Sequence, residues 1–242
     1  MTFNKKKEKQ NLRIIQKIIK TIARLLLCFI IFSIIIILSL KWINPITSSV
    51  MITQHIINKD KEHPVRFKWA DWEDIAPYMP LAVIAAEDQK FFYHYGFDVQ
   101  AILKAIEDNN NNKSRLKGAS SITQQVAKNL FLWKKKSYMR KAFEAYFTTL
   151  LELLWSKKRI LEVYLNIAEF GNNIYGVSAA SNILLGKSAN KLTENNAALL
   201  AAALPNPKKF NVQKPTAYMN KRRVWIKKQI RKLGGIAALK DL

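Results

Sequence analysis

The thirteen residues from Ala86 to Asp98, AEDQKFFYHYGFD, place three acids, one histidine and five aromatic rings directly after the apolar run PLAVIAA. Apolar helical runs do not usually end in adjacent carboxylates flanked by rings. Burial beside Phe91 and Phe92 would raise the pKa of Glu87 toward that of a working base. This stretch alone leaves three interpretations open: a solvated helix end, a metal site, or a carboxylate that takes part in chemistry.

The remaining polar residues of this stretch predict a supporting structure. His94 fits a packed, hydrogen-bonded histidine, Gly96 fits a turn, and Asp98 fits the N-cap of the helix VQAILKAI that follows. The three histidines of the chain show neither HxxxH nor HExxH spacing, and the chain has one cysteine. A zinc enzyme therefore has almost no support in the sequence.

A second polar segment runs from Gly118 to Leu132, GASSITQQVAKNLFL. Small hydroxyl residues open it, and exposed backbone N–H groups at a helix start suit an anion. On a helix, Gln124 and Lys128 share one face, and Gln125 and Asn129 share a neighbouring one. The segment predicts either an ordinary capped surface helix or a stripe of amides and an ammonium group along a binding cleft.

A third segment, residues 134–155, reads KKKSYMRKAFEAYFTTLLELLW. Five cations crowd the start of this predicted helix, where they oppose the helix dipole. Glu144 lies one turn beyond Arg140, so the two residues can form an exposed ion pair that stabilises a helix by only about 0.2–0.5 kcal/mol. We therefore expect something anionic to bind at this helix start.

The net charge of +23 over 242 residues is extreme, while a hydrophobic content of 49% is ample for a buried core. The first 24 residues carry eight basic residues and one acid, a net +7, which leaves +16 on the rest of the chain. Such a basic chain favours a polyanionic partner: nucleic acid, an anionic membrane surface, or a phosphate-bearing substrate.

One segment is apolar enough to cross a membrane. Residues 25–40, LLLCFIIFSIIIILSL, carry no charge, and nineteen residues are reached at Ile43 if Lys41 snorkels. No small-x-small cleavage site follows, so a retained anchor is predicted rather than a signal peptide. The preceding cations place the N-terminus in the cytoplasm. The predicted parts are a basic cytoplasmic N-terminus (1–24), a transmembrane helix (25–43) and an extracytoplasmic domain (44–242).

The part after residue 44 is predicted to be mainly α, because few runs alternate with period two. Residues 67–80 fit a lead-in loop, and residues 107–118, EDNNNNKSRLKG, fit a polar loop. The predicted helices cover residues 81–92, 122–132, 138–155, 157–171 and 193–204, followed by a basic helix that ends at Gly234 and Gly235.

Taken in order, these segments resemble the peptidoglycan glycosyltransferases, the family shared with the N-terminal half of class A penicillin-binding proteins. Five family patterns occur over about 120 residues, and together they resemble the monofunctional, membrane-anchored form. The patterns are ED-x-x-F-x-x-H-x-G-x-D (Glu87 to Asp98), G-[GA]-S-[ST]-I-[ST]-Q-Q-x-x-K-N (Gly118 to Asn129), R-K-x-x-E (Arg140 to Glu144), K-x-x-I-L-x-x-Y-L-N then G-x-x-x-x-G (Lys157 to Gly176), and ALLAA-x-LPNP (Ala198 to Pro207).

The resemblance implies a lysozyme-like helical fold and an enzyme that polymerises lipid II. The new link would be β-1,4, formed with inversion and release of undecaprenyl diphosphate. By motif, Glu87 would be the general base and Glu144 the second functional carboxylate. The implied substrate-binding residues are Ser120, Thr123, Gln124, Gln125, Lys128, Asn129, Lys136, Arg140 and Lys141, and the implied supporting residues are Asp88, Phe91, His94, Gly96 and Asp98.

The resemblance also implies where the enzyme works and with what. Its partners would be lipid II, the growing lipid-linked glycan, the membrane and other cell wall synthesis or division proteins, but not nucleic acid. It would sit in the inner membrane as a single-pass protein with a periplasmic catalytic domain. Some family members are helped by Mg²⁺ or Mn²⁺, although no set of metal ligands can be identified in this sequence.

Two competing interpretations remain. A lysozyme-like lytic enzyme that cleaves glycan shares the catalytic glutamate, but the cation-rich segments disfavour it because a cleaved glycan carries no phosphate. A membrane-tethered scaffold or nucleic-acid binder explains the charge, but it leaves the ordered motifs without a purpose.

Overall fold

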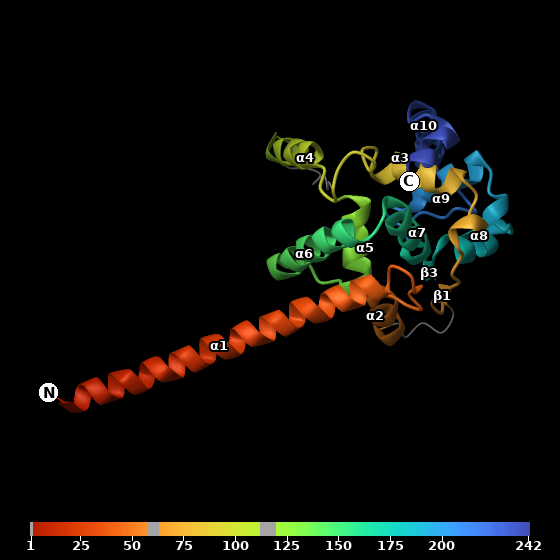
Figure 1. The fold of residues 1–242 in the computed structure, drawn as a ribbon. Helices are drawn as coiled ribbons and strands as arrows, with labels where there is room; N and C mark the ends of the chain where they lie inside the picture. Colours follow the sequence, from red (N-terminus) through yellow and green to blue (C-terminus); the bar gives the residue numbers. More distant parts are fainter. Residues whose placement is uncertain (1, 58–62, 112–119) are drawn as a thin grey trace. The chain divides into compact units, whose positions relative to one another are not determined.

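The structure is a computed structural model that describes residues 2–57, 63–111 and 120–242. The chain divides into two compact units, Met1–Ile43 and Asn44–Leu242, which are described separately (Figure 1).

The first unit is a single long helix, α1 (Thr2–Ser39). Its stretch Asn11–Ser39 is long and apolar enough to cross a membrane. No glycine or proline interrupts the sequence between the basic and the apolar halves, so nothing in the sequence breaks the helix there. The helix α1 therefore continues from the predicted basic N-terminus into the predicted span, and it ends at Ser39, before the expected boundary at Ile43.

The second unit is mainly helical, as predicted, and its described residues include only short strands. Its helices are α2 (Ser49–Ile57), α3 (Tyr78–Glu87), α4 (Val99–Asn111), α5 (Ile122–Phe131), α6 (Tyr138–Leu154), α7 (Lys157–Ile167), α8 (Val177–Leu185), α9 (Glu194–Ala203) and α10 (Ala217–Lys232), with 3₁₀ turns η1 (Trp72–Asp74), η2 (Ala189–Lys191) and η3 (Gly235–Asp241).

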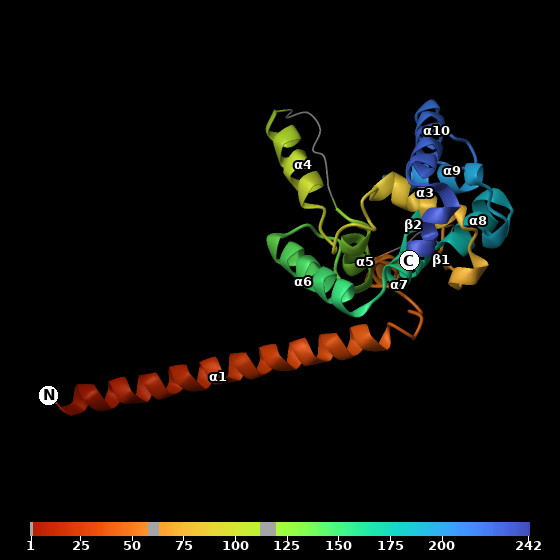
Figure 2. The ribbon, with the colours of Figure 1, turned by 45° about the horizontal axis from the view of Figure 1, so that its top comes forward.

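One half of the core is built on α3, α9 and α10, which lie together in both views (Figures 1 and 2). Every residue of α3 from Met79 to Ala85 is buried, and so is every residue of α9 from Ala197 to Ala203. The small alanines of α9 let neighbouring helices approach closely. Removing this apolar surface from water stabilises the fold by about 25 cal/mol per Å², which fixes the end of α3 firmly.

The other half is built on α5, which packs against both α6 and α7. The rings of Phe131 and Phe147 stack between α5 and α6 with centroids 4.6 Å apart. Ser121, Ser137 and Ser156 cap the starts of α5, α6 and α7 by accepting a hydrogen bond from a backbone N–H two or three residues into the helix. These caps fix the residues at which the three helices begin.

Three short strands form a small sheet in the order β1 (Arg66–Phe67), β3 (Ile174–Tyr175) and β2 (Glu169–Gly171). β1 is parallel to β3, and β2 is antiparallel to it. Gly176 follows β3 with a φ of 80°, and a Cβ there would lie 2.6 Å from the carbonyl oxygen of Asn166. Only glycine fits this approach of the hairpin to α7.

Four predicted boundaries in the second unit were wrong. Residues 169–171 form a strand rather than the end of a helix, because α7 stops at Ile167. Tyr78–Pro80, assigned to a loop, opens α3, since proline is tolerated in a first helical turn; α3 also ends at Glu87, before Phe91 and Phe92. Residues 107–111 continue α4, whereas residues 112–118 of the predicted polar loop lie outside the described residues.

Candidate active site

Two adjacent carboxylates leave the end of α3 for different surroundings. Glu87 is the last helical residue, and Asp88 departs from helical geometry with φ −157° and ψ 74°. Asp88 is buried, at 7% exposure, whereas Glu87 keeps part of its surface open to a cavity. At this helix end, Asp88 therefore has a structural role, whereas Glu87 can contact a ligand.

Asp88 ties the helix end to its neighbours. Its Oδ1 lies 2.8 Å from Nε2 of His94, and its Oδ2 accepts a hydrogen bond from the backbone N–H of Ile122, at 3.0 Å. Ser121 donates from its hydroxyl to the carbonyl oxygen of Gly96 at 2.5 Å. The two bonds from the start of α5 explain why an ED pair and the SSIT segment occur together in one chain.

Phe91, Gly96 and Asp98 complete this support. Phe91 is fully buried, and the ammonium of Lys157 lies 4.5 Å from its ring centroid. Gly96 has a φ of 79°, and a Cβ there would lie 2.6 Å from a methyl carbon of Thr148, so no other residue fits without strain. Asp98 accepts a hydrogen bond from the N–H of Ala101 and so caps α4, as predicted.

Glu87 is held by one neutral donor. Nε2 of Gln125 donates to its Oε2 at 3.0 Å, and the hydroxyl of Tyr164 donates to Oε1 of the same amide at 3.3 Å. Burial is the largest influence on the pKa of Glu87 and raises it, while Gln125, Arg222 and Lys128 oppose that rise. The result is a carboxylate whose affinity for a proton exceeds that of a solvated glutamate.

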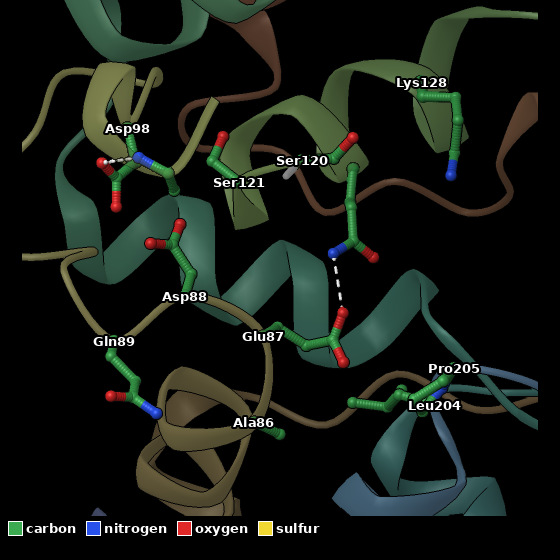
Figure 3. Close-up of a pocket in the computed structure, with 12 residues that line it drawn as sticks. Ala86, Glu87, Asp88, Gln89, Asp98, Ser120, Ser121, Lys128, Leu204 and Pro205 are labelled. Atoms are coloured by element: carbon green, nitrogen blue, oxygen red, sulfur yellow. Dashed lines mark hydrogen bonds between the residues drawn. The ribbon is translucent and has the colours of Figure 1, made fainter. Parts of the chain in front are cut away.

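A cavity of about 530 Å³ opens beside Glu87, as Figure 3 shows. Lys128 lies across it from the end of α3, and Ser120 stands at the entrance to α5 (Figure 3). Its lining residues are Ala86, Glu87, Asp88, Gln89, Asp98, Ala101, Ser120, Ser121, Gln125, Lys128, Leu204 and Pro205.

Two further cavities share Lys128 with the first. One, of about 150 Å³, also shares Gln125 and Leu204 with it. The other, of about 390 Å³, is cation-rich, and its lining residues are Val50, Ser120, Lys128, Asn129, Trp133, Lys134, Lys136, Arg140, Lys141, Glu144 and Glu169. The three cavities therefore adjoin at Lys128, with Glu87 lining the first and a group of cations lining the third, and Ser120 lines both of these.

Glu144 lies at the wall of the cation-rich cavity and is 3% exposed. Its Oε2 accepts a hydrogen bond from Nη1 of Arg140 at 2.6 Å, and its Oε1 accepts one from Nζ of Lys141 at 2.5 Å. Both carboxylate oxygens are therefore engaged by cations. Because Arg140 is nearly buried and Lys141 is about half exposed, the carboxylate fixes both cations at the cavity.

Lys128 is the one cation of the cation-rich cavity that also lines the Glu87 cavity in the described part of the chain. Burial is the largest influence on its pKa and lowers it, and the carboxylates of Glu144 and Glu87 oppose that change. A partly desolvated ammonium interacts more strongly with an incoming anion than a solvated one does. Asn129 and Lys136 also line the cation-rich cavity, and Lys136 is exposed.

The start of α5 differs from the predicted anion site. Ser121 and Gln124 form a capping box, in which each side chain accepts a hydrogen bond from the other residue's backbone N–H. Thr123 is fully buried and donates to Oε1 of Glu152 at 2.5 Å. The N–H of Ile122 is bonded to Asp88, so these backbone donors are already satisfied. Neither Thr123 nor Gln124 lines the three cavities.

The positions of the carboxylates show whether the described residues could bind the Mg²⁺ or Mn²⁺ that helps some family members. No group of three or more His, Cys, Asp or Glu residues within 2–57, 63–111 and 120–242 is placed to hold a metal ion. Asp88 and Glu144 both have their two carboxylate oxygens bonded to protein donors. The described residues do not fit a metal, and no step is assigned to one.

Sequence reasoning missed two residues that act on Glu87. Arg222, on the basic helix α10, donates from Nη2 to the carbonyl oxygen of Ala86 at 2.8 Å. Tyr164, on α7, is buried in the core, and its hydroxyl also orients Gln125. Neither contact has a sequence signal of its own, because 136 residues separate Ala86 from Arg222 and the spacing of Tyr164 is that of any buried helix position.

A mainly helical domain with a buried carboxylate beside a cation-lined cleft defines a class of enzymes that transfer a group to or from an anionic substrate. The sequence model of the family described as Transglycosylase matches residues 53–231. The chain therefore belongs to the transglycosylase family, which confirms the resemblance drawn from the motifs and the expected glycosyl-transfer chemistry.

Relatives support the family over most of the chain. A protein of Shewanella oneidensis is 48% identical over 95% of this chain and 98% of its own length. One of Citrobacter koseri is 51% identical over 78% of this chain and 79% of its own length. One of Pseudomonas entomophila is 43% identical over 94% and 97%. All three are named biosynthetic peptidoglycan transglycosylase.

Proposed function

We propose that this enzyme polymerises lipid II into the β-1,4-linked glycan strands of peptidoglycan, with inversion and release of undecaprenyl diphosphate. The observation that carries the proposal is that Lys128 borders both the Glu87 cavity and the cation-rich cavity. A sugar hydroxyl and a diphosphate leaving group need these two environments side by side.

Glu87 acts as the general base in this proposal. It takes the proton from the 4-hydroxyl of the acceptor N-acetylglucosamine while that oxygen attacks the anomeric carbon of the donor. The bond from that carbon to the diphosphate oxygen breaks, and the diphosphate leaves with the electron pair. A raised pKa suits this step, because a base works best when its pKa approaches the working pH.

Cations stabilise the leaving group. Lys128, Arg140, Lys141 and Lys136 line the cation-rich cavity, where they are placed to bind the diphosphate and its developing charge. Glu144, the second functional carboxylate, holds Arg140 and Lys141 in position rather than exchanging protons. Ser120, Gln125 and Asn129 supply polar contacts along the cleft, whereas Thr123 and Gln124 support the start of α5.

A lytic enzyme of the two-carboxylate type needs a second carboxyl group beside Glu87, and one of the two protonates the sugar leaving group. Of the three acids that line the Glu87 cavity, Asp88 and Asp98 accept hydrogen bonds from protein donors, and Asp98 caps α4. A cation-rich cavity has no counterpart in a neutral glycan. Both observations favour transfer from a diphosphate over glycan cleavage.

The proposed placement is a single-pass protein of the inner membrane. Residues 1–24 form the basic cytoplasmic end, residues 25–43 the span, and residues 44–242 the periplasmic catalytic domain. The eight cations among the first 24 residues support this orientation. Membrane tethering keeps the enzyme where a lipid-linked substrate and a lipid-linked growing glycan are concentrated in two dimensions. Other cell wall synthesis or division proteins remain proposed partners.

The test is incubation of the full-length protein in detergent with labelled lipid II. We expect a ladder of long glycan that a muramidase digests to disaccharide units, and no ladder from the Glu87→Gln protein. A parallel incubation with purified cell wall should release no anhydro-sugar fragments. Fragments without polymer would replace this proposal with the lytic one.

A further inference from the structure

Arg222 brings a helix from the end of the chain to the catalytic carboxylate. Its Nη2 donates to the carbonyl oxygen of Ala86, the residue before Glu87, at 2.8 Å. Its guanidinium carbon lies 4.2 Å from the ring centroid of Trp225, one turn along α10. The neighbouring Arg223, of the same charge, is not among the groups that act on Glu87.

Packing of α10 holds Arg222 in place beside the end of α3. Met219, Ile226 and Ile230 are the buried residues of the helix, and α10 packs against both α3 and α9. With three buried anchors the helix cannot slide along α3 without exposing apolar surface. The stacking of the guanidinium on Trp225 then limits the rotamers of Arg222. The packing of α10 therefore fixes the backbone of Arg222, and Trp225 restricts its guanidinium group.

The receiving end is the last turn of α3, whose carbonyl groups have no intrahelical donors. Side chains supply those donors. Gln89 donates from Nε2 to the carbonyl of Ala85 at 3.2 Å, and Arg222 donates to that of Ala86. A cation at this end also complements the negative end of the helix dipole. Of these two residues, only Arg222 adds charge.

We propose that Arg222 is a positioning residue for the transfer reaction: its guanidinium fixes the last turn of α3, from which Glu87 projects, and keeps a positive charge near that carboxylate. The inference rests on the proposed role of Glu87 as base. Arg222 touches neither the acceptor hydroxyl nor the diphosphate in this proposal. It acts only through the geometry and the ionisation of Glu87.

The charges around Glu87 come from several elements. Lys128 on α5 and Arg222 on α10 lower its pKa, as does the amide of Gln125, while burial and the adjacent Asp88 raise it. Tyr164 on α7 is fully buried with a pKa well above its usual range, so it stays a neutral hydroxyl. Lys128 will be engaged by the diphosphate when substrate binds. Arg222 is then the cation that continues to keep Glu87 ionised.

The experiment compares Arg222→Met, Arg222→Lys and the control Arg223→Met as full-length proteins. For each, the pH profile of kcat/KM for lipid II is measured together with kcat, KM and thermal stability. Without Arg222 the pKa of Glu87 rises, so the acidic limb of Arg222→Met should move to higher pH by about one unit. Its kcat should fall about tenfold while KM changes little, because the diphosphate cations are untouched.

Arg222→Lys keeps the charge but loses the planar donor, so its kcat should fall while its acidic limb stays at the wild-type pH. Arg223→Met should match the wild type in both. An unmoved acidic limb in a folded Arg222→Met protein overturns the inference. If Arg222→Met does not fold, wild-type kcat in Arg222→Lys overturns it. Turnover by Glu87→Gln would instead contradict the proposed base.

Discussion

Two glutamates on different helices show how surroundings give identical side chains different roles. Glu87, at the end of α3, accepts a hydrogen bond from the neutral amide of Gln125 and faces a cavity. Glu144, in the second turn of α6, accepts one bond from Arg140 and one from Lys141. Glu87 is largely buried and, among the described residues, accepts a hydrogen bond at one oxygen, so it can take a proton, whereas Glu144, engaged by two cations, serves as their anchor.

The largest expected effect is on Glu87. Replacing Glu87 by Gln keeps size and polarity but removes the proton acceptor, so lipid II polymerisation should fall about a thousandfold or more. Turnover of labelled lipid II by the folded protein measures this. The control is Glu73→Gln, whose side chain is 76% exposed and should leave turnover unchanged. Normal polymerisation by Glu87→Gln would contradict the role of Glu87 as proton acceptor, and with it the proposed difference between Glu87 and Glu144.

A smaller loss is expected from Glu144→Gln. Arg140 and Lys141 lose their counter-charge and shift from the cavity, so kcat/KM should fall about tenfold to a hundredfold, mainly through KM. Steady-state kinetics separates KM from kcat.

The matched control for that measurement is Glu162→Gln, which breaks the similarly buried pair with Arg159 on α7 without touching the three cavities. A loss in kcat alone, equal to that of Glu87→Gln, would show that Glu144 also takes part in proton transfer.

Lys128 joins the two regions, and its removal tests whether they form one cleft. Lys128→Ala removes a desolvated cation, so affinity for a diphosphate-bearing substrate should weaken about tenfold. Binding of labelled lipid II to the otherwise inactive Glu87→Gln protein measures this without turnover. Lys187→Ala, on an exposed residue bonded to Asn196, serves as the control. Unchanged affinity in Lys128→Ala would separate the cation-rich cavity from substrate binding.

The smallest expected effect concerns stability. Because burial raises the pKa of Glu87, the folded state holds this proton more tightly than the unfolded state, and ionised Glu87 costs stability once the pH rises above the unfolded value near 4.5. The free energy of unfolding of Glu87→Gln should therefore exceed that of the wild type by about 1 kcal/mol at pH 7.5, and the variant should unfold at a higher temperature.

That advantage should vanish as the pH falls below 4.5, where the wild-type carboxyl is also neutral in both states. Glu144→Gln should change stability in the opposite direction, because it leaves Arg140 buried without its partner. Thermal unfolding of both variants at the two pH values measures the contrast. A less stable Glu87→Gln protein at pH 7.5 would mean that ionised Glu87 is held favourably.

Local patterns carried much of the fold prediction. The apolar span, the helical character and the caps at Asp98 and Thr193 follow from spacing and composition, and the structure contains them. The sheet was missed because its strands are two or three residues long, too short for a period-two signal. The ends of α3 and α7 were misplaced because packing, rather than helix propensity, stops them.

The candidate site divides in the same way. Sequence motifs place Glu87, Lys128 and Glu144 on the right elements, but they do not show that Thr123 and Gln124 turn inward. That outcome depends on Glu152 and on the capping box, which only the folded chain brings together. The contact of Arg222 with α3 likewise could not be predicted from the sequence, because it joins residues 136 positions apart.

The bond between Arg222 and Ala86 has a consequence for how the enzyme is made. It joins residues 136 positions apart, and such long loops close late in folding. During synthesis the segment of Glu87 emerges long before α10 does, so the end of α3 lacks the hydrogen bond from Arg222 until α10 has been made. We expect that a chain shortened before Thr216 is inactive even where its other helices form. Activity would then depend on a helix that is made more than a hundred residues after Glu87.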